Sequence, residues 1–142
     1  MVDKAVDKKD NKAKVIKDED FVDPDNHAYN VIGTRFEIEK RFEIIDPIGS
    51  GAYGVVVAAK DTSIEENKED ESNLVAIKKI VKAFEHRVFS LRTYRELKIQ
   101  RLLEHENVLG IKRILKPKNK ETFNEIYVVS ELMETDLGVI IK

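Results

Sequence analysis

Three groups of residues along the middle of the chain could together hold the phosphates of a nucleotide. The first is the glycine-rich turn at residues 49–54, Gly-Ser-Gly-Ala-Tyr-Gly. The second is Lys78, which ends the run Val-Ala-Ile-Lys, and the third is Glu96. Glycines let backbone N–H groups approach phosphate oxygens, a lysine can grip these oxygens, and an acid can hold that lysine. Each group alone is a weak signal, but their order and spacing favour a phosphate-binding site.

The position of the glycine turn narrows the kind of phosphate site. We predict strands over residues 41–48 and 55–60, so the turn joins two strands. The dinucleotide-binding fingerprint needs a helix directly after its glycines, and the other common phosphate loop needs a Gly-Lys-Ser/Thr sequence that does not follow here. A structural hairpin with permissive glycines is the alternative. Val56 extends the pattern to G-x-G-x-x-G-x-V and favours a turn that covers phosphates.

Lys78 lies on a short apolar strand that we predict over residues 74–81. Side chains alternate between the faces of a strand, so Ala76 and Lys78 point to one face and Lys79 to the other. The small side chain of Ala76 leaves room for a flat ring beside the lysine, and Val56 on the neighbouring strand could close the same roof. We expect Lys79 to be the solvated lysine of the two.

Glu96 is the candidate partner of Lys78, because a buried lysine without an acid is costly. It lies on a helix predicted over residues 86–104, which is rich in Arg, Leu, Lys, Glu and Gln and lacks Gly and Pro. The alternative is that Lys78 is a surface lysine of an edge strand and that Glu96 pairs locally with Lys98 or Arg92. The glycine turn favours the pair between strand and helix.

These elements predict a sheet that carries the turn and the lysine, with the helix against it. The helix follows three strands, two more strands lie near residues 108–116 and 125–131, and a last helix begins near Thr135. Consecutive strands with short links favour antiparallel pairing. The predicted fold class is therefore α+β, with an antiparallel sheet and a helix packed on one face.

Composition excludes several classes of protein. The 142 residues suffice for one domain, and a formal net charge of -2 argues against a nucleic-acid binder. No apolar run approaches the roughly 20 residues that span a bilayer, and the N-terminus lacks the apolar stretch of a signal peptide. The chain has no cysteine, which rules out disulfides and thiolate metal sites and fits an intracellular protein.

Two charged segments flank the predicted strands. Residues 1–28 are dominated by Lys, Asp, Glu and Asn, so we expect a disordered tail or a mobile helix there, with a docking tail as the alternative. Residues 61–73 form a polar, acidic loop. Its default interpretation is a solvated connector, and a partner-binding insert is the alternative.

Taken together, these residues resemble a eukaryotic protein kinase, and more narrowly a mitogen-activated protein kinase. The narrow resemblance covers residues 30–142 and rests on four short motifs: Arg-Thr-Tyr-Arg-Glu-Leu at 92–97, His-Glu-Asn-Val at 105–108, Phe-Asn-Glu-Ile-Tyr at 123–127 and Leu-Met-Glu-Thr-Asp-Leu at 132–137. It implies a kinase N-terminal lobe, with a five-stranded antiparallel sheet and one regulatory helix, over residues 29–132. Residues 133–142 would then be the hinge and the start of the first C-lobe helix.

The resemblance implies a role for each residue of the site. Lys78 and Glu96 would be catalytic, with Lys78 on the α- and β-phosphates of ATP and Glu96 orienting it. The remaining nucleotide-binding positions would be the turn over the phosphates, the adenine roof, the gatekeeper Ser130, the hinge and the ribose contact: Ile48, Gly49, Ser50, Gly51, Ala52, Tyr53, Gly54, Val56, Ala76, Ser130, Glu131, Met133 and Asp136.

Regulation is implied by two arginines one helical turn apart, Arg92 and Arg95. In the family such arginines receive a phosphorylated activation loop, which would couple phosphorylation to the placement of Glu96. A solvated helix face is the alternative for both. Two positions depart from the family pattern: Gln100 stands where an apolar residue usually packs, and Ser130 is smaller than common gatekeepers, which predicts a roomy back pocket.

The implied function is transfer of phosphate from Mg²⁺-ATP to Ser or Thr of protein substrates, before Pro, in a cascade with an upstream activating kinase. We expect the His-Arg-Asp, Asp-Phe-Gly and Thr-x-Tyr motifs of the family beyond Lys142, since none occurs here, and the metal ligands with them. This chain alone is then expected to be inactive. The alternative is a half-kinase that acts as a non-catalytic binding module. We expect no nucleic-acid or membrane partner and an intracellular location, in the cytoplasm or nucleus.

Overall fold

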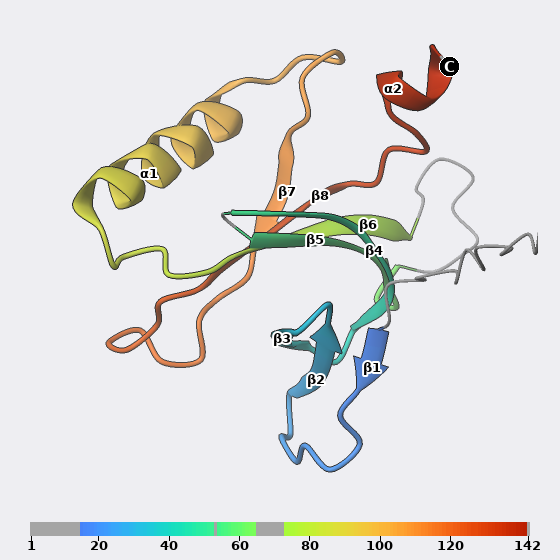
Figure 1. Ribbon diagram of the computed structural model, residues 1–142, viewed down its shortest axis with the longest axis vertical. Coiled ribbons are helices and arrows are strands. Elements are labelled where there is room, and N and C mark those ends of the chain that lie inside the picture. The colour runs from blue at the N-terminus through green and yellow to red at the C-terminus, as the bar shows by residue number, and fades with distance from the viewer. Residues whose placement is uncertain (1–14, 53, 65–72, 142) are drawn as a thin grey trace, which may run out of the picture.

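The computed structural model describes residues 15–52, 54–64 and 73–141 and arranges them in two antiparallel sheets with two helices (Figure 1). The smaller sheet has the order β1-β2-β3, and the larger has the order β4-β5-β6-β8-β7. The strands and helices are β1 (Val15–Lys17), β2 (Asn26–Val31), β3 (Thr34–Glu39), β4 (Phe42–Gly51), β5 (Gly54–Asp61), β6 (Leu74–Ile80), α1 (Arg87–Leu102), β7 (Ile111–Ile114), β8 (Ile126–Glu131) and α2 (Leu137–Ile140).

The five-stranded antiparallel sheet and its helix confirm the predicted fold class. In this sheet each strand except β7 lies within a few residues of its predicted range. Runs of β-branched residues mark the strands, and glycines and polar loops mark their ends. β7 is shorter than the range 108–116 predicted for it. β6 lies at the centre of this sheet, between β5 and β8, so Lys78 is not on an edge strand.

The three-stranded sheet was not predicted, and it corrects the disorder expected for residues 1–28. Within that segment the structure describes residues 15–28, which contain β1 and the start of β2; residues 1–14 lie outside the described residues. Ile32 and Gly33 form a two-residue turn between β2 and β3, with φ of 50° and 75°. Positive φ at both turn residues is the geometry of a type I′ hairpin, which pairs β3 with β2 and so organises the part of β2 within this segment.

The core lies between the two sheets. The largest fully buried side chains come from both of them and include Phe36 and Ile38 of β3 and Val57, Val75 and Ile77 of the large sheet. The small sheet covers one side of the large sheet, and both helices lie on the other side (Figure 1). One sheet face therefore packs into the core and the opposite face is left for the predicted site.

α1 makes fewer buried contacts than the strands that form the core. Thr93 is its only fully buried residue among those the structure describes, and Phe89 and Leu97 pack partly against Ile80 and Val128. Several apolar side chains of α1 are exposed, among them Leu102 at 71%. Neither helix in the described part of the chain has the length and apolar content that a membrane span requires.

Candidate functional site

A cavity of about 550 Å³ lies on the helix side of the large sheet. β4, β5 and β6 supply one wall through Ile48, Val56, Ala76 and Lys78, and α1 contributes Glu96. The rest of the lining comes from α1, the start of β7 and the loop before it, β8, and the segment after β8 up to α2. The cavity brings together the following residues of the predicted site: Ile48, Val56, Ala76, Lys78, Glu96, Ser130, Glu131, Met133 and Asp136. These residues are spread over 89 positions of the sequence, and the sheet places them around one space.

Lys78 and Glu96 form an ion pair across the cavity, with 2.9 Å between Lys78 Nζ and Glu96 Oε1. The strand side of the pair is β6 and the helix side is α1. The side chains are 39% and 45% exposed, so the pair adds little to stability but holds the ammonium group at the cavity wall. The predicted pair between strand and helix is therefore present.

The glycine turn closes the hairpin of β4 and β5. Gly51 pairs with Gly54, and Gly49 pairs with Val56. A Cβ added at Gly49 or Gly51 would meet no atom within 4 Å, so both glycines border open space. The predicted residues 49–52 and Gly54 do not line the cavity wall itself, and Tyr53 lies outside the described residues. Residues 49–52 are exposed, as a backbone that approaches a ligand would be.

Gly54 has a separate structural reason to be glycine. Its φ is +151°, and a Cβ there would lie 1.8 Å from the carbonyl oxygen of Lys79 on β6. Gly54 is thus a position at which the backbone of the hairpin comes especially close to the strand that carries Lys78.

We predict that Gly54→Ala destabilises the protein by about 1–3 kcal/mol or more, because alanine is strained at this φ and collides with a backbone carbonyl. Gly51→Ala is the matched control, since its added methyl group enters open space. Thermal unfolding of the two variants should show a lower Tm for Gly54→Ala only. Equal Tm values would contradict the close approach of the turn to β6.

The back of the cavity is polar at two positions. Ser130 is the register partner of Ala76, and its hydroxyl lies 3.5 Å from the carbonyl oxygen of Glu131. Gln100, one turn of α1 after Glu96, also lines the cavity. The two departures singled out in the sequence therefore both line this cavity.

Sequence reasoning missed part of the cavity lining: Leu97, Leu109, Gly110, Ile111, Val128, Glu134, Thr135 and Val139. Val128 could have been found, because it lies two residues before Ser130 on β8 and so faces the same side. The residues of the loop before β7 carry no such periodic signal. Asp136 lines the cavity as predicted and also caps α2, since its carboxylate accepts the Val139 N–H at 2.9 Å.

The opposite face of β6 corrects the expectation for Lys79. This lysine is only 3% exposed, because the small sheet covers it. Its ammonium group lies 2.8 Å from Glu125 Oε1, donates a hydrogen bond to the carbonyl oxygen of Arg35, and lies 5.8 Å and 5.4 Å from the ring centres of Phe36 and Tyr127. Of the two neighbouring lysines, Lys79 is therefore buried and Lys78 is the more exposed.

Comparison with known proteins identifies the family. The profile of the protein kinase domain matches residues 42–142. The chain belongs to the protein kinase family. Among its relatives, "Extracellular signal-regulated kinase 1" of Dictyostelium discoideum is 49% identical over 117 residues, which is 82% of this chain and 21% of that protein. "Mitogen-activated protein kinase 5" of Arabidopsis thaliana is 50% identical over 115 residues, 80% of this chain and 29% of that protein.

These matches confirm the resemblance to mitogen-activated protein kinases and the fold class of a kinase N-terminal lobe. A third relative, "Mitogen-activated protein kinase 4" of Oryza sativa subsp. japonica, is 44% identical over 129 residues, 86% of this chain and 33% of that protein. The chain thus spans between about a fifth and a third of the length of these relatives. Proteins of this family generally use ATP and Mg²⁺.

The two arginines predicted to be regulatory lie on α1 of this kinase lobe, and both are exposed. Arg92 lines a second pocket of about 400 Å³, together with Ala52 of the glycine turn and His86 before α1. Arg95 does not line that pocket. The structure therefore brings Arg92, but not Arg95, beside the glycine turn.

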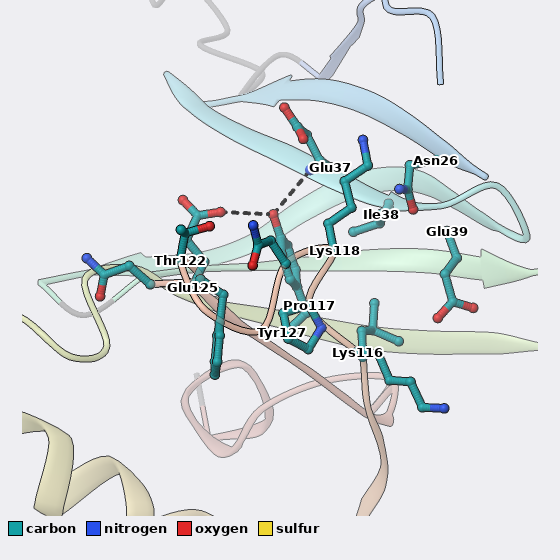
Figure 2. A pocket seen from close by; sticks show the side chains of 14 residues that line it. Asn26, Glu37, Ile38, Glu39, Lys116, Pro117, Lys118, Thr122, Glu125 and Tyr127 are labelled. Carbon is teal, nitrogen blue, oxygen red and sulfur yellow. Dashed lines mark hydrogen bonds between the residues drawn. The ribbon is translucent and has the colours of Figure 1, made fainter. Parts of the chain in front are cut away.

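A third pocket, of about 500 Å³, lies between β3 and the segment that joins β7 to β8, away from the cavity that Lys78 and Glu96 line (Figure 2). The Tyr127 hydroxyl at its centre accepts the Glu37 N–H at 3.1 Å, and burial raises the pKa of this hydroxyl. Two acidic side chains that line this pocket already form ion pairs: Glu37 lies 2.8 Å from Arg35, and Glu125 lies 2.8 Å from Lys79. Sequence reasoning placed no site residue here.

Proposed function

We propose that the complete protein that carries this chain is a mitogen-activated Ser/Thr protein kinase and that this chain supplies its ATP-binding lobe. The observation that carries the proposal is the Lys78–Glu96 pair, at 2.9 Å, on the wall of a cavity roofed by Val56 and Ala76. A binding module without catalysis has no physical need for such a pair. The same proposal places the protein inside the cell, in a cascade with an upstream activating kinase.

The lining of the cavity fits ATP in size and chemistry. About 550 Å³ is within the range of roughly 300–1,000 Å³ found for small-molecule sites. Val56 and Ala76 offer a narrow apolar roof for a flat base, and the main chain at Glu131 and Met133 would hydrogen-bond its edge. Asp136 would accept a ribose hydroxyl with the carboxylate oxygen that does not cap α2.

Lys78 would act on the phosphates. Its ammonium group neutralises charge on the α- and β-phosphates, and Glu96 fixes where that group lies. Backbone N–H groups of the glycine turn would cover the same phosphates, and the open space beside Gly49 and Gly51 allows that approach.

Bound ATP supplies the phosphoryl group, and Mg²⁺ neutralises its developing charge. Among the described residues no cluster of three or more His, Cys, Asp or Glu could hold a metal ion, so we assign no Mg²⁺ ligand within them. We propose that these ligands and the catalytic base belong to a second lobe outside this chain.

The activity is tested by incubating the complete protein, after phosphorylation by an activating kinase, with Mg²⁺-ATP and a pair of peptides. One peptide carries Ser-Pro and the other Ser-Ala at the same position. Incorporation of phosphate into the Ser-Pro peptide alone supports the proposal. Nucleotide binding without phosphate transfer to any peptide would favour the binding module instead.

The small Ser130 predicts how the cavity treats bulky ligands. We expect ATP-competitive inhibitors with a large group toward Ser130 to bind the wild type about tenfold or more tightly than Ser130→Met, since forcing extra methylenes into a filled space costs about 1–3 kcal/mol. Measured Kd values decide the matter, with an inhibitor that lacks the large group as the control. Equal Kd values of both proteins for the bulky inhibitor would contradict the roomy back pocket.

A further inference from the structure

Lys78, Glu96 and the glycine turn at residues 49–54 are together called the phosphate clamp. Lys79 contacts three strands that lie next to it. Its side chain reaches Arg35 of β3 and Glu125, which directly precedes β8. Its carbonyl oxygen is the atom on which Gly54 of β5 packs. Lys79 thus joins the small sheet, the end of the glycine turn and the strand that carries Lys78.

The Lys78–Glu96 pair cannot hold β6 in place by itself. Both of its side chains are more than a third exposed, and exposed pairs contribute about 0–1 kcal/mol. α1 buries only Thr93 among its described residues, so the helix offers little further support. Glu96 holds the ammonium group, but the course of β6, from which Lys78 enters the cavity, must be set by other contacts of that strand.

Lys79 is a buried polar anchor of that strand, in addition to its pairing with β5 and β8. A buried ammonium group is costly unless it is paired and hydrogen-bonded, and Lys79 is both. Because it directly follows Lys78 and points to the opposite face, any shift of Lys79 toward solvent would rotate β6 and move Lys78 away from Glu96.

We propose that Lys79 is a positioning residue for the phosphate clamp. The small sheet, through Arg35, and Glu125 hold Lys79 on the far face of β6, and this fixes the direction in which Lys78 enters the cavity. The inference rests on the proposed nucleotide-binding function and adds to it a residue that does not touch the nucleotide.

A double-mutant cycle on the complete protein tests this coupling, with the Kd of a fluorescent ATP analogue plus Mg²⁺ as the readout. Lys79→Met should weaken binding about fivefold or more in the wild-type background, a coupling at the low end of those between linked sites. In the Lys78→Met background the same change should weaken binding less than about twofold, the error of simple additivity. An equal weakening in both backgrounds would overturn the proposal, as would no weakening in either.

The same cycle distinguishes failure of the proposed function from failure of the inference about Lys79. If Lys78→Met leaves the Kd unchanged, Lys78 grips no phosphate, and the proposed function and the inference both fall. If Lys78→Met weakens binding but Lys79→Met is not coupled to it, only the inference falls.

Two further variants separate positioning from general loss of stability. Val31→Ala removes buried apolar contact from β2 without touching Lys79, so it should lower Tm and leave the Kd unchanged. Glu125→Gln weakens the anchor at a half-exposed residue and decides the matter if Lys79→Met does not fold. Its binding should weaken only when Lys78 is present, and wild-type binding by Glu125→Gln in that case would overturn the proposal.

Discussion

Replacement of Lys78 by Met in the complete protein should lower kcat for phosphate transfer by about 100-fold or more, the scale seen when one preorganised charged or donor group is lost from a transition state. Methionine keeps an unbranched apolar side chain and removes the ammonium group that lies 2.9 Å from Glu96. The phosphates then lose their fixed cation, and Glu96 loses its partner. Steady-state kinetics with Mg²⁺-ATP and a Ser-Pro peptide measure the effect.

Lys98→Met is the matched control for this experiment. Lys98 is an exposed lysine on the same helix as Glu96, but it does not line the cavity, so its replacement should leave kcat unchanged. Glu96→Gln should give a smaller loss than Lys78→Met, because it frees the lysine without removing it. An unaffected kcat in Lys78→Met would end the assignment of Lys78 to the phosphates.

The second large effect is expected at Phe36 of the small sheet. Phe36 is fully buried between the two sheets, stacks edge-on against Tyr127 at 5.8 Å and lies below the ammonium group of Lys79. Phe36→Ala should lower the free energy of unfolding by about 3–5 kcal/mol, because it removes the ring and leaves a cavity. Urea unfolding of the complete protein measures this loss.

Val22→Ala is the control for Phe36→Ala. Val22 lies between β1 and β2 and is 95% exposed, so its replacement should change the free energy of unfolding by less than about 0.5 kcal/mol. If Phe36→Ala were as stable as Val22→Ala, the small sheet would not contribute to the folding core of this lobe.

The large sheet could be predicted from the sequence because its signals are local. Glycines mark the turn before β5, β-branched residues fill β5 and β6, and the helix around Glu96 lacks breakers. The cavity followed from the same signals, since alternation along β6 and the order of the motifs already placed Ala76, Lys78 and Glu96 together.

The small sheet and the burial of Lys79 could not be predicted, because both depend on contacts between distant residues. The partners of Lys79 are Arg35 and Glu125, which lie 44 and 46 positions away in the sequence. Alternation places Lys79 on the same face as the buried Val75 and Ile77, but it does not show which distant groups would pair with a buried ammonium group. Likewise, the polar residues around β1 conceal that Tyr29 and Val31 of β2 are buried by the large sheet.

Because α1 packs loosely, Glu96 lies on an element that opens more often than the strand that carries its partner Lys78. Backbone hydrogen bonds at the centre of a buried sheet open only when the whole domain unfolds, whereas an element with few buried contacts opens on its own at a lower free energy. The amide hydrogens of α1 should therefore exchange with solvent long before those of β6. Each such opening moves Glu96 away while Lys78 stays in place. The Lys78–Glu96 ion pair therefore forms and breaks through motion of α1 alone.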